Sequence, residues 1–245
     1  MSMDTGWLAD NWAQIRRRVD AACREAGRDP AEVAILPVSK TFGPELIRAG
    51  VALGMRRFGE NKVQEIRDKA PVLADCGIDW VMIGHLQTNK AKDVARLASE
   101  VQSLDRLELA EALDRRLQHE GRAIDVLVQV KTSTEPSKYG LPPEQLPGFL
   151  DTLRGYGTLR VRGLMTLAIH SSEPVQVRAC FRLLRELRDR AVAEGHDLKR
   201  LSMGMSDDFP LAVAEGATEL RIGTAIFGSR PYPDSHYWPE PPAKV

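Results

Sequence analysis

One lysine stands where a buried strand should end, in the stretch AILPVSKTFG at residues 34–43. Lysine is rarely buried without a charged partner, so the position of Lys40 needs an explanation. Its amine could be solvated, could pair with an anionic ligand, or could attack a carbonyl carbon and form a Schiff base. The stretch alone favours a solvated amine, because that is the ordinary state of a lysine at a strand end. A nucleophile would need a ligand site nearby.

Two glycine-containing stretches near the C-terminus are typical of a phosphate site. LSMGMSDDFP contains Ser206, and LRIGTAIFG contains Gly223 and Thr224 at the start of a short predicted helix. Gly223 lets the backbone approach an anion, while the hydroxyls of Ser206 and Thr224 are donors for it. The alternatives are a tight turn at Gly223 and a helix cap at Ser206 and Asp207. With Lys40 nearby, the stretches predict a small phosphorylated ligand.

Arg221 lies two residues before Gly223, in the strand that ends at the predicted phosphate site. If its side chain faces inward, it contacts any ring held between that site and Lys40. This combination suits pyridoxal 5'-phosphate (PLP), with the aldehyde on the lysine and the phosphate at the turn. Arginine keeps its proton, so it would donate to the pyridine nitrogen and leave the ring a weaker electron sink. The alternative is a salt bridge of Arg221 with Glu60 or Asp207.

An alternation of strands and helices would bring these residues together. Predicted strands lie at 33–39, 56–58, 79–83, 101–104, 125–130, 159–165, 198–202 and 219–222. Predicted helices lie at 44–53, 61–74, 88–98, 106–120, 143–154, 174–194 and 207–215, with a short one from Thr224. Each strand is followed by a helix, which implies parallel strands. We therefore predict an α/β fold, a single (β/α)8 TIM barrel whose last strand lies beside the first.

An open, doubly wound sheet is the alternative fold. It is less well supported, because no GxGxxG motif follows the first predicted strand. In the barrel, functional residues gather where the strands end. Residues 1–245 are predicted to form one domain, with an N-terminal helix at about 5–26, the barrel at about 33–230 and a proline-rich tail at 231–245.

The composition indicates a cytoplasmic protein of ordinary charge. Lys plus Arg equals Asp plus Glu at 34 each, which gives no attraction to nucleic acid or to an anionic membrane. No apolar segment has the length that a membrane helix needs, and no signal peptide is evident. The three cysteines are far apart, so neither a disulfide framework nor a metal site is expected.

Several long stretches resemble the pyridoxal phosphate homeostasis protein family (YggS/PROSC), which is related to the N-terminal barrel of alanine racemase. They are AILPVSKT, RRFGENKVQE, WVMIGHLQTNK, the DRLELAEALD region, SKYGL, LRVRGLMT, LSMGMSDDFPLAVAEGAT and ELRIGTAIFGSR, and they span roughly residues 33–230. The resemblance implies the alanine racemase-like barrel of fold type III PLP proteins. One stretch, LMTLAIHS, departs from the family's LMAI-plus-proline pattern, so the residue that covers the ring after the sixth strand is open.

The resemblance also implies roles for individual residues. Lys40 would hold PLP covalently as an aldimine, and Arg221 would face the pyridine nitrogen. The phosphate would be held by Ser206, Gly223 and Thr224. Asn61 would lie near the cofactor ring, although it could simply cap the helix that starts there.

The function implied by the resemblance is to hold PLP, to act in intracellular PLP homeostasis and to deliver PLP to PLP-dependent apoenzymes, without robust catalysis and with no catalytic residue. A PLP-dependent racemase-like enzyme is the alternative. Alanine racemase relatives take a second acid/base group from a further domain, whereas the tyrosines beyond this barrel, Tyr232 and Tyr237, lie in the tail. A sugar-phosphate barrel enzyme without PLP is a third hypothesis. We expect a monomer or a weak homodimer that binds neither nucleic acid nor membranes.

Overall fold

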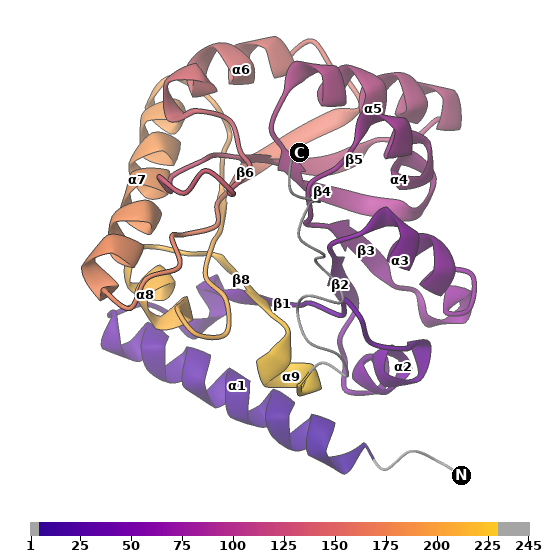
Figure 1. Ribbon diagram of the computed structural model, residues 1–245, viewed down its shortest axis with the longest axis vertical. Helices are drawn as coiled ribbons and strands as arrows, with labels where there is room; N and C mark the ends of the chain where they lie inside the picture. The colour runs from indigo at the N-terminus through magenta and orange to yellow at the C-terminus, as the bar shows by residue number, and fades with distance from the viewer. Residues whose placement is uncertain (1–4, 230–245) are drawn as a thin grey trace, which may run out of the picture.

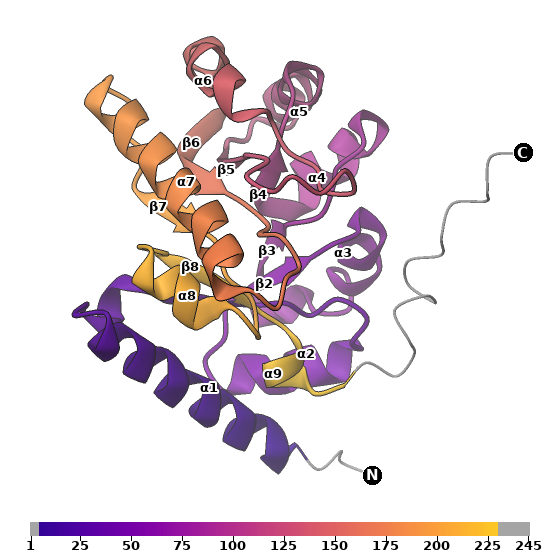
Figure 2. The ribbon, with the colours of Figure 1, turned by 60° about the vertical axis from the view of Figure 1, so that its left-hand side comes forward.

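In the described part of the chain, eight short parallel strands form one sheet that curls into a barrel, with helices around its outside (Figures 1 and 2). The computed structural model describes residues 5–229. The strands are β1 (Ala34–Pro37), β2 (Arg57–Glu60), β3 (Asp79–Met82), β4 (Ala98–Leu104), β5 (Ile124–Gln129), β6 (Leu159–Met165), β7 (Arg200–Ser202) and β8 (Glu219–Ile222). The predicted α/β (β/α)8 barrel is therefore confirmed.

The helices follow the strands one by one, as the sequence pattern predicts. They are α1 (Gly6–Glu25), α2 (Pro44–Ala52), α3 (Val63–Lys69), α4 (Ala91–Leu97), α5 (Leu107–Glu120), α6 (Leu146–Leu153), α7 (Pro174–Ala193), α8 (Phe209–Ala214) and α9 (Thr224–Phe227). Short 3-10 helices lie at Pro30–Glu32, Ala74–Cys76, Thr88–Lys90 and Pro143–Gln145. Proline within the first turns of α2, α6, α7 and α8 favours their starts, because its missing N–H is not needed there.

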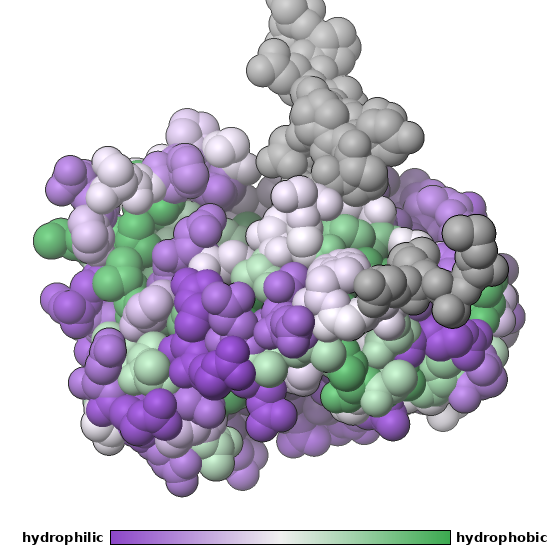
Figure 3. Space-filling model, turned by 90° about the horizontal axis from the view of Figure 1, so that it is seen from below, coloured by the Kyte–Doolittle hydropathy of each residue, from purple (hydrophilic) through white to green (hydrophobic). Residues whose placement is uncertain are grey.

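The N-terminal helix α1 is an addition to the barrel and packs against α8 and α9 (Figure 2). Leu8, Ile15 and Val19 form its buried stripe, while Arg16 and Arg17 are exposed. Figure 3 views the molecule from the side where α1 lies and shows hydrophilic side chains interspersed with small apolar areas. Arg16 and Arg17 thus belong to a solvated face.

The barrel closes through two unequal seams. β1 pairs with β8 along four residue pairs, from Ala34 opposite Glu219 to Pro37 opposite Ile222. β1 and β2 are joined only by a bridge between Val38 and Gly59 among the described residues. The barrel is therefore nearly closed, and the ends of β1, β2 and β8 lie side by side. This adjacency is what a joint site at these strand ends requires.

Charged side chains occupy the end of the barrel opposite the strand C-termini. Arg57 donates to Glu219 Oε2 at 2.6 Å and to Glu100 Oε2 at 2.8 Å. Arg200 completes the cluster with bonds of 2.8 Å to Oε2 of each of the same carboxylates. Glu219 and Glu100 are buried, and such charges are tolerated inside a protein only when paired and hydrogen-bonded.

One strand boundary differs from the prediction. β2 runs to Glu60, whereas the predicted strand ends at Phe58. That prediction was wrong because RRF is a weak pattern and the paired glycine continues the strand.

No helix among residues 5–229 combines the length and apolarity needed to cross a membrane. The predicted tail at 231–245 lies outside the described residues.

Candidate functional site

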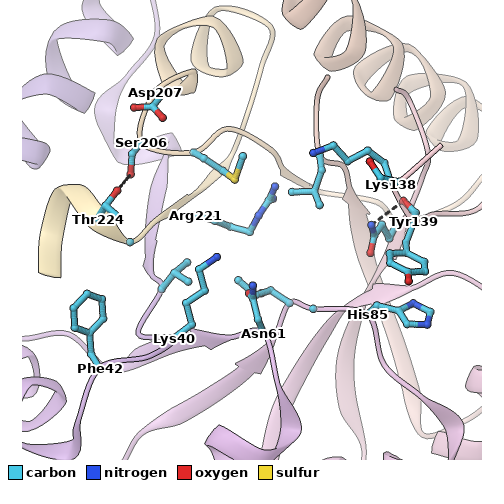
Figure 4. Close-up of a pocket in the computed structure, with 18 residues that line it drawn as sticks. Lys40, Phe42, Asn61, His85, Lys138, Tyr139, Ser206, Asp207, Arg221 and Thr224 are labelled. Carbon is cyan, nitrogen blue, oxygen red and sulfur yellow. Dashed lines mark hydrogen bonds between the residues drawn. The ribbon is translucent and has the colours of Figure 1, made fainter. Parts of the chain in front are cut away.

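A cavity of about 540 Å³ lies at the C-terminal ends of the strands. Its lining includes the six residues predicted from the sequence, which are Lys40, Asn61, Ser206, Arg221, Gly223 and Thr224. Figure 4 shows the amine of Lys40 and the guanidinium of Arg221 directed toward the middle, with Thr224 on one side and Tyr139 on the other. The barrel explains this convergence, because the parallel strands end at one rim.

The backbone around Lys40 is fixed on both sides. Lys40 is half-buried just beyond β1. The amide of Ser39 donates to the carbonyl of Gly59 at 3.0 Å, and the amide of Thr41 donates to Glu65 Oε2 at 2.6 Å. Thr41 has φ 73, a left-handed conformation that β-branched residues rarely adopt. The lysine is therefore presented by a constrained turn.

The predicted phosphate residues lie together at the ends of β7 and β8. Thr224 Oγ1 donates to Ser206 Oγ at 3.4 Å (Figure 4). Gly223 is the N-cap residue of α9, whose first amides have no carbonyl partner within the helix. Gly204, at φ 94, shapes the Ser206 loop, and a Cβ there would lie 2.6 Å from the Cβ of Ala212. The sequence therefore needs glycine at 204 to place the Ser206 hydroxyl.

The alternative role of Ser206 and Asp207 as a helix cap is wrong. The N-cap residue of α8 is Asp208. Its Oδ1 accepts a hydrogen bond from the Met205 amide at 2.5 Å, which closes the loop in front of the helix. Ser206 instead faces Thr224 and the cavity.

Arg221 is buried at the floor of the cavity and is not in a salt bridge with Glu60 or Asp207. Its Nη1 donates to Ser202 Oγ at 2.7 Å, and its Nη2 donates to the Thr166 carbonyl at 2.7 Å. Burial lowers its pKa to about 10, so the guanidinium stays protonated at neutral pH. Two neutral acceptors therefore orient a cation toward the cavity.

The orientation of Arg221 depends on the barrel interior. Ser202 Oγ accepts from Arg221 and donates to Gln102 Oε1 at 2.7 Å. Gln102 Nε2 in turn donates to Glu100 and Glu219, the two carboxylates of the charged cluster. A continuous chain of hydrogen bonds thus runs from the cavity floor to the opposite end of the barrel.

The wall on the side of β2 and β3 is built from Asn61 and His85. Gly84 lies so close to Asn61 that a Cβ there would be 2.1 Å from the Asn61 carbonyl oxygen. The ring of His85 stacks on Tyr139, with 4.0 Å between centroids and 17° between planes. His85 therefore acts as a contact residue that holds Tyr139 at the cavity wall.

Several cavity residues were not singled out by sequence reasoning. Lys138 and Tyr139 enter from the loop after β5, whose base is pinned by a bridge between Val130 and Leu141. The SKYGL stretch carried this signal, but nothing in its pattern shows that the loop turns back to the cavity. Leu167, from the stretch LMTLAIHS, lines the wall after β6.

A buried charged cluster lies behind Lys40 and does not line the cavity. Lys69 Nζ donates to Glu60 Oε1 at 2.7 Å, to Glu65 Oε2 at 2.8 Å and to the Ser39 carbonyl at 2.9 Å. Ser39 Oγ also donates to Glu60 Oε1 at 2.7 Å. Burial raises the pKa of Glu60 to about 7 despite the opposing effect of Lys69. Sequence reasoning missed this cluster as well.

The cavity thus combines an amine, a fixed guanidinium and a pair of hydroxyls. These groups suit an anionic ligand that also carries a carbonyl, because the amine can attack a carbonyl carbon while the others donate hydrogen bonds. Within residues 5–229, no group of three His, Cys, Asp or Glu side chains is placed to hold a metal ion.

Comparison with known proteins places this chain among close relatives. The family model described as "Alanine racemase, N-terminal domain" matches residues 4–231. The pyridoxal phosphate homeostasis protein of Pseudomonas aeruginosa is 41% identical over 225 residues, which cover 92% of this chain and 96% of the relative. The protein of the same name from Escherichia coli is 37% identical over 228 residues, covering 92% and 97%.

Solved structures agree with this assignment. PipY of Synechococcus elongatus, solved with PLP bound, superimposes with a TM-score of 0.80 at 35% identity, covering 90% of this chain and all of PipY. An alanine racemase of Clostridium difficile matches with a TM-score of 0.68 at 13% identity, covering 89% of this chain and 60% of the racemase, which shows the shared fold alone. This chain therefore belongs to the pyridoxal phosphate homeostasis protein family, whose barrel is that of the alanine racemase N-terminal domain.

Proposed function

We propose that this chain binds PLP in the cavity and acts in PLP homeostasis. The observation that carries the proposal is the convergence of Lys40, Arg221 and the Ser206–Thr224 hydroxyl pair on one cavity of about 540 Å³. An amine, a ring-nitrogen donor and phosphate donors match the aldehyde, pyridine and phosphate of PLP. The names of the Pseudomonas and Escherichia relatives, and PipY with PLP bound, support the same ligand.

The proposal assigns the covalent bond to Lys40. Its amine would hold the aldehyde carbon of PLP as an imine, with the aldehyde oxygen lost as water. Lys138 also lines the cavity, but it enters from the opposite wall and its Nζ lies 3.6 Å from Glu135 Oε2. Lys40 is on the same side as the phosphate residues, which supports it as the partner of the aldehyde.

The other predicted residues have noncovalent roles in this proposal. Ser206, Gly223 and Thr224 hold the phosphate, and Asn61 contacts the ring from the side of β2. Bound PLP supplies an electrophilic carbon and a conjugated ring that can accept electrons. Arg221 donates to the pyridine nitrogen and so disfavours protonation of the ring. A ring without that proton is a weaker electron sink, which suits holding the cofactor more than carbanion chemistry.

We further propose that the protein holds PLP in the cytoplasm and delivers it to apoenzymes without robust catalysis of its own. Cys23, Cys76 and Cys180 are free thiols, which supports a reducing compartment. A monomer or a weak homodimer stays our prediction for the assembly.

A racemase-like activity is the second candidate, and one observation favours it. Lys138 and Tyr139 line the wall opposite Lys40, where a second acid/base group would have to stand. Incubation of PLP-loaded protein with single amino-acid enantiomers tests this activity. Enzyme-like conversion of one enantiomer into the other, lost in the Tyr139→Phe or Lys138→Met variant, would replace the carrier proposal by an enzymatic one.

Borohydride reduction followed by peptide mass mapping tests the PLP proposal directly. We expect a reduced pyridoxyl adduct on Lys40 in protein incubated with PLP, and none in the Lys40→Ala variant. Lys138→Ala is the matched control, because it removes the other cavity amine described above and should keep the adduct. An adduct on another lysine, or none in PLP-saturated protein, would refute the assignment.

A further inference from the structure

Lys69 stands out as a buried cation that the proposed chemistry does not use. Its side chain is 9% exposed. Lys69 is the last residue of α3, the helix that follows β2. Its Nζ has three oxygen acceptors, which are the Ser39 carbonyl, Glu60 Oε1 and Glu65 Oε2. An ammonium has three N–H donors, so these contacts account for all of them. Lys69 is therefore held as a structural cation and is no candidate nucleophile.

The three acceptors connect Lys69 to both neighbours of Lys40. On one side, Lys69 binds the Ser39 carbonyl directly, and Glu60 accepts from the Ser39 hydroxyl at 2.7 Å. On the other side, Glu65 Oε2 accepts from the Thr41 amide at 2.6 Å while it pairs with Lys69. The same cation thus ties down the residue before Lys40 and the residue after it.

The hydrogen bond from the Thr41 amide to Glu65 is made at a strained position of the backbone. Thr41, at φ 73, is in the left-handed region without being glycine, and it needs surrounding contacts to stay there. A charge-assisted hydrogen bond from its amide to Glu65 supplies such a contact. The turn sets the direction in which the Lys40 side chain leaves the strand end.

We propose that Lys69 is a positioning residue for Lys40, and that it acts through Glu60 and Glu65 to hold the 39–41 turn so that the Lys40 amine faces the cavity. This inference rests on the proposed function, because it treats Lys40 as the amine that meets PLP. Lys69 touches neither the cavity nor, in this scheme, the cofactor.

Two test variants, Glu65→Ala and Lys69→Met, are each compared with a control variant. Glu65→Ala removes the acceptor for the Thr41 amide, whereas Glu65→Gln keeps an oxygen in the same place. Glu65 is one-fifth exposed, so both variants should fold. Lys69→Met removes the cation. Glu215→Gln is a control for the loss of a buried, ion-paired charge, because Glu215 pairs with Arg178, Arg182 and Arg185 away from the cavity.

Two measurements are made on each folded variant. Amide hydrogen exchange at Thr41 in cofactor-free protein reports the turn, and the initial rate of formation of the borohydride-trapped Lys40 adduct reports the amine. Loss of one charge-assisted hydrogen bond corresponds to about a tenfold change. We expect about tenfold faster exchange and about tenfold slower trapping in Lys69→Met and Glu65→Ala, a smaller change in Glu65→Gln, which keeps the oxygen but not the charge, and Glu215→Gln close to wild type.

The outcomes separate this inference from the proposed function. If wild-type protein forms no Lys40 adduct, the proposed function fails, while the exchange at Thr41 still tests the turn. If Lys69→Met does not fold, the Glu65 pair carries the test. Unchanged exchange and trapping in Glu65→Ala, or trapping that is slowed equally in Glu215→Gln, would overturn the positioning role.

Discussion

The buried carboxyl of Glu60 predicts a pH dependence of stability that a glutamine at this position would lack. Glu60 is fully buried, and its Oε2 has no hydrogen-bond partner among the described residues. Burial without a partner for one oxygen disfavours the charged form, which raises the pKa to about 7 from an ordinary value of 4.5. The perturbation is Glu60→Gln, which keeps Oε1 for Ser39 and Lys69 but cannot ionise.

The sign and size follow from the two pKa values. Because the pKa of Glu60 is higher in the folded state, the folded protein binds more protons than the unfolded chain between pH 4.5 and about 7. Its contribution to stability is therefore fully present below pH 4.5 and is lost as the pH rises through 7. The full difference corresponds to about 3 kcal/mol, of which about 2.5 kcal/mol falls between pH 5 and pH 8.

Urea unfolding of wild type and Glu60→Gln at pH 5 and pH 8 measures this contribution. Asp125, Glu215 and Glu219, whose pKa values are lowered by arginine partners, are common to both proteins and cancel in the comparison. We expect the free energy of unfolding of wild type to fall by about 2.5 kcal/mol more than that of the variant. Parallel changes in the two proteins would show that Glu60 does not titrate in this range and would refute the reasoning.

Three further predictions concern the phosphate residues and the barrel. Thr224→Val should weaken PLP retention about tenfold in equilibrium dialysis while the Lys40 adduct persists, since one hydrogen bond to an anion is lost; equal retention would contradict a phosphate role. Gly204→Ala should cost more than about 1 kcal/mol in urea unfolding, because φ is 94 and Ala212 is in the way. Gly27→Ala, at φ 67 with open space, is its matched control and should cost less. Arg57→Met should cost about 3–5 kcal/mol by leaving buried carboxylates short of a partner, and a loss under 1 kcal/mol would argue against that cluster as a support of the barrel.

The fold and six of the cavity residues were accessible from the sequence because both depend on local patterns. Apolar runs followed by amphipathic segments predict βα units, and the rule that parallel strands end at one rim brings Lys40 to Thr224. The strand at RRFGE was misjudged at its end, since two of its residues, Gly59 and Glu60, are weak strand formers. Pairing with β3 overrides that preference.

Lys69 behind the cavity, and Lys138 and Tyr139 on its wall, could not be predicted from local sequence patterns. Lys69 lies at the end of an amphipathic helix next to polar neighbours, where a lysine ordinarily meets water. Its burial depends on a contact with Ser39, which follows β1 and is thirty residues away in the sequence, and no local pattern predicts such a contact. Lys138 and Tyr139 belong to a loop without periodicity, so only the bridge between Val130 and Leu141 reveals that the loop returns to the cavity.

The hydrogen bonds of Arg221 bear on whether the proposed site carries PLP or uses it for catalysis. Although burial lowers its pKa, the guanidinium stays protonated at neutral pH, so this residue donates and does not accept. Its Nη1 and Nη2 donate to Ser202 Oγ and to the Thr166 carbonyl, both neutral groups fixed on the barrel. A donor held this firmly cannot turn into a partner for a protonated pyridine. Through Ser202 and Gln102, the barrel interior fixes this donor at the cavity floor, which supports the proposal that PLP is held and not activated.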